Sequence, residues 1–203
     1  MTKNLTRAEA AGFFLANDNF NILTHRRPDG DTLGSAATLC RGLRQLGKTA
    51  YLLPNPGLTN STAPYFAPYA APADFVPDKV VSTDIATVNL LPENAKEYIG
   101  RIDLAIDHHG TNVGYAAATC VDGDCAAAAM VILRILRLLE VELTPAIAAC
   151  LYTGIATDTG CFMYSNTTAY THKVAAALME QGIDVFQNVS LPVAPSQIDA
   201  VFL

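Results

Sequence analysis

The sequence predicts an α/β fold with a doubly wound, mainly parallel sheet flanked by helices. Two observations carry this prediction. Short apolar or β-branched runs alternate along the chain with helix-length amphipathic segments. Histidine or aspartate follows directly after several of the short runs. Because parallel strands end at one edge of a sheet, where α/β proteins bind ligands, we expect a site at that edge.

The composition restricts the possible functions. Hydrophobic residues make up 51% and charged residues 16% of the 203-residue chain, which indicates one large folded domain. The net charge of −6 argues against binding of long duplex nucleic acid, which requires a basic stripe. The longest strongly apolar run, 125–133, is too short to span a membrane. Five scattered cysteines favour reduced thiols and a cytoplasmic location.

The expected elements alternate in order along the chain. Strands are predicted at 21–24, 48–53, 79–83, 101–106 and 116–121, and helices at 6–17, 32–46, 89–99, 126–140, 144–157 and 167–181. Thr6 and Glu9 predict a capping box for the first helix, and Gly47 ends the second. The proline-rich segment 54–77 predicts an irregular loop with one helical turn, and a loop this long is uncommon unless it covers something.

The stretch from Asn21 to Ser35 combines a strand, a polar turn and the start of a helix. His25, Asp29 and Asp31 lie within seven residues of one another. Two carboxylates this close repel unless a cation lies between them, which favours a metal site. The alternative is a tight turn in which Asp31 caps the helix. That interpretation accounts for one aspartate and leaves His25 unexplained.

Further polar side chains stand at the ends of other expected elements. They are Asp84, Asp107, His108, His109 and Asp158. In a parallel sheet these residues can converge on one crevice with the first stretch. Each has an ordinary alternative, such as a helix cap for Asp84 or a turn position for Asp158. These separate interpretations share no common cause, whereas a single site explains the positions of all five residues.

Four segments resemble the four motifs of the DHH phosphoesterase superfamily. They are H-R-R-P-D-G-D-T-L-G-S at 25–35, D at 84, D-H-H at 107–109 and T-G-I-A-T-D-T-G at 153–160. The resemblance covers roughly residues 20–185, and Y-S-N-T-T at 164–168 looks typical of the DHH/DHHA1 subgroup of nanoRNase and pAp-phosphatase type. It implies a DHH catalytic domain over 1–185. Residues 186–203 would start a linker to a C-terminal DHHA1 domain that is absent from this chain.

The resemblance also implies a site with two divalent cations. Manganese is expected first, with Mg²⁺, Co²⁺ or Fe²⁺ as alternatives, because the ligands are carboxylates and imidazoles without thiolate. The implied metal ligands are His25, Asp29 and Asp84 for one ion, and Asp31, Asp84, His108 and Asp158 for the other. His109 is expected at the scissile phosphate, and Asp107 is expected to orient a histidine. The implied substrate contacts are Arg26, Ser35 and His109.

The implied activity is hydrolysis of phosphodiester or phosphomonoester bonds by a hydroxide that two metal ions activate. The expected substrates are short oligonucleotides or 3′-phosphoadenosine 5′-phosphate (pAp). Hydrolysis of polyphosphate, pyrophosphate or a cyclic dinucleotide is an alternative of the same chemical class. A non-catalytic nucleotide-binding module is an alternative of another class. No membrane partner is expected, and the sequence leaves the oligomeric state open, a homodimer included.

Overall fold

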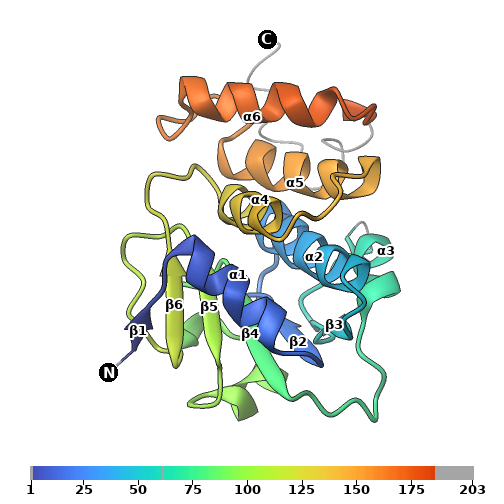
Figure 1. Cartoon of the computed structure of the whole chain (residues 1–203), viewed down its shortest axis with the longest axis vertical. Coiled ribbons are helices and arrows are strands. Elements are labelled where there is room, and N and C mark those ends of the chain that lie inside the picture. The colour runs from blue at the N-terminus through green and yellow to red at the C-terminus, as the bar shows by residue number, and fades with distance from the viewer. Residues whose placement is uncertain (1, 61, 186–203) are drawn as a thin grey trace.

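A six-stranded, all-parallel sheet forms the centre of the computed structural model, which describes residues 2–60 and 62–185 (Figure 1). The strands are β1 (Lys3–Asn4), β2 (Phe20–Leu23), β3 (Ala50–Leu52), β4 (Lys79–Thr83), β5 (Leu104–Asp107) and β6 (Ala118–Val121). Their order across the sheet is β1-β6-β5-β4-β2-β3. The predicted fold class is therefore confirmed. The expected linker, 186–203, lies outside the described residues.

Helices cover the two faces of the sheet unequally. The α-helices are α1 (Arg7–Ala16), α2 (Gly30–Gln45), α3 (Ala63–Phe66), α4 (Ala128–Leu138), α5 (Pro145–Asp158) and α6 (Ala169–Met179). The 3₁₀ segments are η1 (Ala67–Tyr69), η2 (Val88–Leu90) and η3 (Glu93–Tyr98). Helices α1, α2 and α4 cover one face, and α5 and α6 stack outside them as further layers (Figure 1). The opposite face packs against η3 through a smaller apolar cluster.

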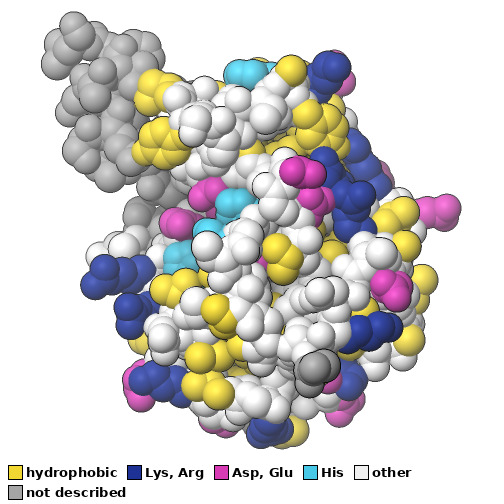
Figure 2. All heavy atoms as spheres, turned by 90° about the vertical axis from the view of Figure 1, so that its left-hand side faces the viewer, with side chains coloured by type: hydrophobic (Ala, Val, Ile, Leu, Met, Phe, Trp, Pro, Cys, Tyr) yellow, Lys and Arg dark blue, Asp and Glu magenta, His cyan; other side chains and the backbone are white. Residues whose placement is uncertain are grey.

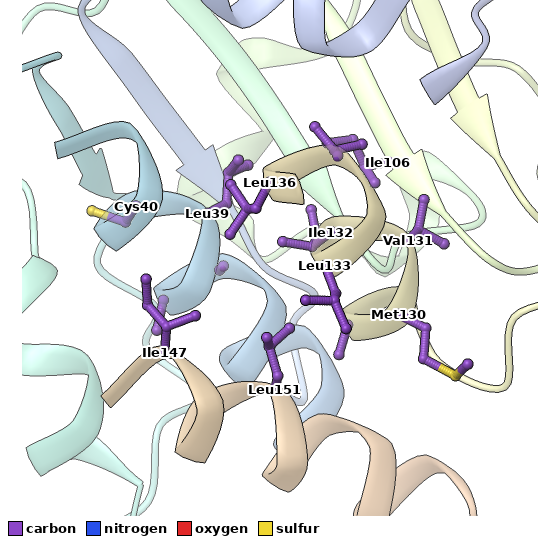
Figure 3. Packing of buried hydrophobic residues seen from close by; sticks show 14 of the residues in the cluster. Leu39, Cys40, Ile106, Met130, Val131, Ile132, Leu133, Leu136, Ile147 and Leu151 are labelled. Atoms are coloured by element: carbon purple, nitrogen blue, oxygen red, sulfur yellow. The ribbon is translucent and has the colours of Figure 1, made fainter. Parts of the chain in front are cut away.

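The main core lies between the sheet and the helices. Leu39 of α2, Leu133 of α4 and Leu151 of α5 are buried there and point into the space between their helices (Figure 3). Helix α5 is thus enclosed by α2, α4 and α6, as its nearly all-apolar sequence predicts. Among the described residues, no helix combines the length and apolarity that crossing a bilayer would require.

The elements differ from the sequence prediction at three places. Strand β1 was not predicted, because Lys3 and Asn4 are too few and too exposed to give an apolar pattern, although they pair with β6. The second helix begins earlier than expected, and Asp29 rather than Asp31 caps it. The helix predicted at 89–99 is replaced by two 3₁₀ segments on either side of Pro92, whose missing N–H cannot continue a helix.

Two glycines allow α2 and α5 to approach closely. A Cβ atom on Gly34 would overlap the carbonyl oxygen of Cys150 on α5. A Cβ atom on Gly154 of α5 would lie 2.8 Å from Oδ1 of Asp31 and 2.9 Å from Cβ of Ala129. The close contact therefore brings the end of α5 next to the start of α2, where the predicted site residues lie.

The substitution Gly34→Ala tests this contact. We expect it to lower the free energy of unfolding by about 3 kcal/mol, because the added methyl group meets backbone rather than a flexible side chain. Gly12→Ala is the matched control, since nothing lies within 4 Å of its added Cβ and it should stabilise α1 by about 0.5–1 kcal/mol. Urea denaturation followed by circular dichroism measures both. Equal stability of the two variants would contradict the close packing of α2 and α5.

Candidate functional site

Three strands and two helices deliver side chains to one crevice at the carboxyl edge of the sheet. Nε2 of His25 lies 3.6 Å from Oδ2 of Asp84, the residue that follows β4. Nε2 of His108, which follows β5, lies 3.6 Å from Oδ1 of Asp84. The same nitrogen lies 3.4 Å from Oδ2 of Asp158 at the end of α5. Figure 2 shows histidine and acidic side chains gathered on one face of the molecule.

The ligand atoms form three overlapping groups. Within each group they lie within 4.8 Å of one another, a spacing that could hold a metal ion. One group consists of His25, Asp29 and Asp84, and another of Asp31, His108 and Asp158. The third shares Asp84 and His108 with these groups and adds Asp107 and His109. Asp84 joins them, because its two oxygens face the histidines of different groups.

Two buried atoms at the junction of these groups have no hydrogen-bond partner among the described residues: Oδ1 of Asp84 and Nε2 of His108. Buried polar atoms without a partner cost stability, and native proteins contain few of them. Carboxylate oxygen and imidazole nitrogen are also suitable ligands for divalent first-row metals. The residues present therefore fit a divalent metal ion.

His108 is oriented by a backbone carbonyl. Its Nδ1 lies 3.2 Å from the carbonyl oxygen of Cys125, which can only accept a hydrogen bond. The proton of the neutral ring must therefore lie on Nδ1, and Nε2 presents a lone pair to the carboxylates. A cation between these facing acceptors would satisfy all of them.

Asp84 has an unusual backbone conformation. Its φ of 59° lies in the left-handed region, which is sterically costly for a residue with a Cβ atom, although aspartate tolerates it better than most. The N–H of Asp84 donates to the carbonyl oxygen of Ile106, 2.9 Å away on β5. This bond holds the strained residue at the strand end and fixes the direction of its carboxylate.

Asp31 is anchored to the start of α4. Its Oδ2 accepts from the N–H of Ala128 at 2.6 Å and its Oδ1 from the N–H of Ala129 at 2.9 Å. The N-cap residue of α4, Ala127, has no side chain that could do this. Ser35 also donates to Oδ1 of Asp31, at 3.1 Å. These bonds fix a carboxylate that is fully buried.

Asp107 organises the two histidines that follow it. Its Oδ1 accepts from the N–H of His108 at 2.8 Å and lies 2.8 Å from Nδ1 of His109, while Oδ2 accepts from the side chain of Asn112. Although burial raises the pKa of Asp107, the hydrogen bonds from His109 and Asn112 outweigh it and hold the pKa below its usual value. The bond to Asp107 raises the pKa of His109 to about 9.

Three of the remaining carboxylates resist ionisation. Asp29 does not, because the effect of burial is outweighed by the interactions with His25 and by backbone hydrogen bonds, which lower its pKa. Burial, together with the charges of neighbouring carboxylates, raises the pKa of Asp31 and of Asp84. Burial likewise raises the pKa of Asp158 to about 6. Burial would lower the pKa of His25, but hydrogen bonds with Asp29 and Asp84 outweigh it and raise that pKa to about 9. If all the carboxylates of the crevice were ionised, they would carry more negative charge than its histidines could balance.

The structure brings together all the histidines and aspartates that the sequence singled out. They are His25, Asp29, Asp31, Asp84, Asp107, His108, His109 and Asp158. The two other expected substrate contacts differ in their exposure to solvent. Arg26 is exposed on the loop after His25. Ser35 is fully buried behind Asp31, so its hydroxyl does not reach the surface of the crevice.

Sequence reasoning missed two asparagines that hold the site together. The side-chain amide of Asn55 donates to the carbonyl oxygen of His25 at 2.8 Å. That of Asn166 donates to the carbonyl oxygens of Asp158 and Ala126 at 3.0 and 3.1 Å. Asn55 follows closely after β3, so the rule that located the other residues at strand ends could have found it. Asn166 follows no strand, but it lies within the Y-S-N-T-T segment at 164–168, for which no structural role was predicted.

Comparisons with known proteins identify the family to which the chain is similar. Residues 19–155 match the DHH family, N-terminal domain. Over 163 residues the chain is 37% identical to the bifunctional oligoribonuclease and PAP phosphatase NrnA of Thermus thermophilus, covering 80% of this chain and 50% of that protein. The chain spans about half the length of the curated relatives it matches.

Two solved structures share the fold. An exopolyphosphatase-related protein from Bacteroides fragilis superposes with a TM-score of 0.74 at 19% identity, covering 95% of this chain and 62% of that one. The exonuclease RecJ bound to manganese superposes with a TM-score of 0.51 at 16% identity, covering 87% of this chain and 46% of that one. At these identities the likeness concerns the fold alone.

The raised pKa values predict how the metal-free chain responds to pH. A carboxyl group with a raised pKa stabilises the folded state below its ordinary pKa of 3.8, and this contribution is lost as pH rises through about 6. We therefore expect the melting temperature in EDTA to fall between pH 4 and 7. The loss from Asp158 is at most about 3 kcal/mol, at 1.36 kcal/mol per pKa unit.

Scanning calorimetry in EDTA compares the melting temperatures of Asp158→Asn and the wild type between pH 4 and 7. This variant should lose less stability between pH 4 and 7 than the wild type, because its amide does not ionise. The matched control is Asp124→Asn, at an exposed position, which should follow the wild type. Parallel curves for all three proteins would show that Asp158 does not carry the effect.

Proposed function

This chain belongs to the DHH family, and from that premise we propose that it is a metal-dependent phosphoesterase. The proposed substrates are short oligonucleotides or pAp, the substrate classes in the name of its 37% identical relative. The observation that carries the proposal is the pair of buried, unpartnered atoms on Asp84 and His108, which face each other at 3.6 Å. A phosphate ester is a substrate that such a cation site can polarise.

The proposed ligands divide between two ions. His25, Asp29 and Asp84 would hold one, and Asp31, Asp84, His108 and Asp158 would hold the other, with Asp84 shared. Manganese is the first choice because the donors are oxygen and imidazole nitrogen, and RecJ, which shares the fold, was solved with manganese. Two divalent ions there would lower the pKa of a water nucleophile and neutralise charge on the phosphate.

The chain's own residues then position and stabilise the reacting phosphate. His109 is half-exposed, and its bond to Asp107 keeps it protonated at neutral pH. Because Nδ1 faces Asp107, the remaining donor is Nε2–H, which can donate to a phosphate oxygen or protonate a leaving group. We propose that Arg26 contacts a phosphate from the exposed loop. Ser35 instead orients Asp31.

The same observations give less support to the alternative functions. A non-catalytic module would not need a complete set of ligand side chains with unpartnered atoms directed at one another. Hydrolysis of pyrophosphate or polyphosphate would use the same ions, and a panel of substrates would separate it from the proposed activity. The five free cysteines support the proposed cytoplasmic location.

Isothermal titration with Mn²⁺ tests the proposed site. The wild type should bind two ions, and Asp84→Ala should lose at least one of them because it removes the shared ligand. Hydrolysis of bis(p-nitrophenyl) phosphate should fall by more than about 100-fold in the same variant. Asp74→Asn, which removes an exposed carboxylate from the loop before β4, is the control and should behave as the wild type. Indistinguishable heats for Asp84→Ala and the wild type would defeat the proposal.

A further inference from the structure

A second cavity lies along the same edge of the sheet as the metal residues. Strand β6 neighbours β5, and Asp122 follows β6 directly, as His108 follows β5. The N–H of Asp122 donates to the carbonyl oxygen of Asp107, 3.1 Å away. Beside Asp122 is a cavity of about 670 Å³ between β6, α4 and the start of α1. An adjoining hollow of about 480 Å³ extends it toward α6.

Three arginines line these two cavities: Arg7 of α1 and Arg134 and Arg137 of α4. Nη1 of Arg7 and Nη1 of Arg134 both lie 2.6 Å from the same oxygen, Oδ2 of Asp122. Each guanidinium carries five N–H groups, so most of these donors remain available to a second anion. Figure 2 shows a group of lysine and arginine side chains on the same face as the histidine and acidic group.

Arg137 has no such partner. Its side chain is exposed, and within the described residues its guanidinium group makes no hydrogen bond or ion pair. Against the three arginines the cavities offer only Asp122 and Asp124, which leaves a local excess of positive charge. The whole chain carries a net charge of −6, so this excess is a local feature of the surface.

An aromatic ring stands beside the arginines. The Arg134 guanidinium lies 4.9 Å from the centre of the Tyr170 ring on α6. Tyr170 is 40% exposed, and the neighbouring Leu138 is 53% exposed. Positive grooves with exposed aromatic rings are typical of sites for single-stranded nucleic acid, in which phosphates contact arginines and bases stack on the rings.

The length of α4 gives the distance from the metal residues. Asp31 contacts the helix at Ala128, and at 1.5 Å per residue Arg134 and Arg137 lie about 9 and 14 Å further along its axis. A stacked strand rises about 3.4 Å per nucleotide. Along the axis of α4, the Cα atoms of the two arginines therefore lie about three and four nucleotides from Ala128, where Asp31 contacts the helix.

We propose that Arg7, Arg134, Arg137 and Tyr170 form a strand subsite, which binds the third and fourth nucleotides of a single-stranded oligonucleotide whose end occupies the metal site. This inference rests on the proposed phosphoesterase function and extends it to substrate length. A dinucleotide or pAp is too short to reach the strand subsite. Longer single strands gain phosphate and stacking contacts there.

The test compares Arg137→Glu with Arg101→Glu in the Mn²⁺-loaded protein. Both change an exposed arginine by two charges, but Arg101 lies before β5, at the opposite edge of the sheet. For a single-stranded RNA pentanucleotide, kcat/KM should fall about 10-fold in Arg137→Glu and stay within twofold in Arg101→Glu. For a dinucleotide, both variants should match the wild type. The salt dependence of pentanucleotide binding should weaken by about 0.7 in logarithmic slope, as for one lost phosphate contact.

Fluorescence anisotropy of a labelled pentanucleotide in EDTA measures binding to the strand subsite in the absence of catalysis. Weaker binding by Arg137→Glu than by Arg101→Glu would support the subsite even if the wild type hydrolysed nothing, an outcome that would overturn only the proposed function. Equal effects of Arg137→Glu on both substrate lengths, or none on either, would overturn the subsite. So would unchanged binding with an altered molecular mass in light scattering, which would identify a protein interface instead.

Discussion

The buried carboxylate of Asp31 is the contact on which the site and the helix layer both depend. A charge removed from water must be hydrogen-bonded or neutralised, and Asp31 meets this requirement with two backbone N–H groups of α4 and the hydroxyl of Ser35. The same bonds supply the N-terminal cap that α4 lacks in its own sequence. Asp31 thus joins α2 to α4 and holds its carboxylate beside His108, at 3.9 Å. Gly154 gives it room, since a side chain there would meet it.

Other features of the crevice lower the free energy of unfolding of the chain. Asp84 has a left-handed backbone, and its Oδ1 and Nε2 of His108 are buried without partners among the described residues. These features would be liabilities in a purely structural strand end, and such departures from local rules concentrate at functional sites. The backbone conformation and the unpartnered atoms are related through Asp84, because the strained backbone directs its carboxylate toward His108. A cation between the two unpartnered atoms would recover the free energy that their burial costs.

The sequence predicted the ligand group because one rule, that parallel strands end at one edge, applies to residues far apart in the chain. His25, Asp84 and His108 all follow strands, so their convergence could be predicted without knowing any contact between the strands. The features that escaped prediction depend on contacts across the fold. Strand β1 exists only through its pairing with β6, and the role of Asp31 as a cap for α4 depends on a helix nearly a hundred residues later. Local capping preferences could not decide between Asp29 and Asp31, since both are aspartates at the same helix start.

The order of the strands separates the acidic crevice from the arginine side chains along the carboxyl edge of the sheet. The metal residues stand over β2, β4 and β5, whereas Asp122 and the arginines stand over β6 and the start of α1. Short β1 is what brings Arg7 to this edge, because its pairing with β6 sets where α1 begins. The arginine guanidiniums share one oxygen of Asp122, which keeps two like charges close together and directed at the same cavity. An anionic strand lying along the edge would therefore meet cations held by carboxylates at one end and fixed guanidiniums at the other. Affinity for a longer strand can then arise locally, although the net charge of −6 on this chain disfavours the binding of polyanions.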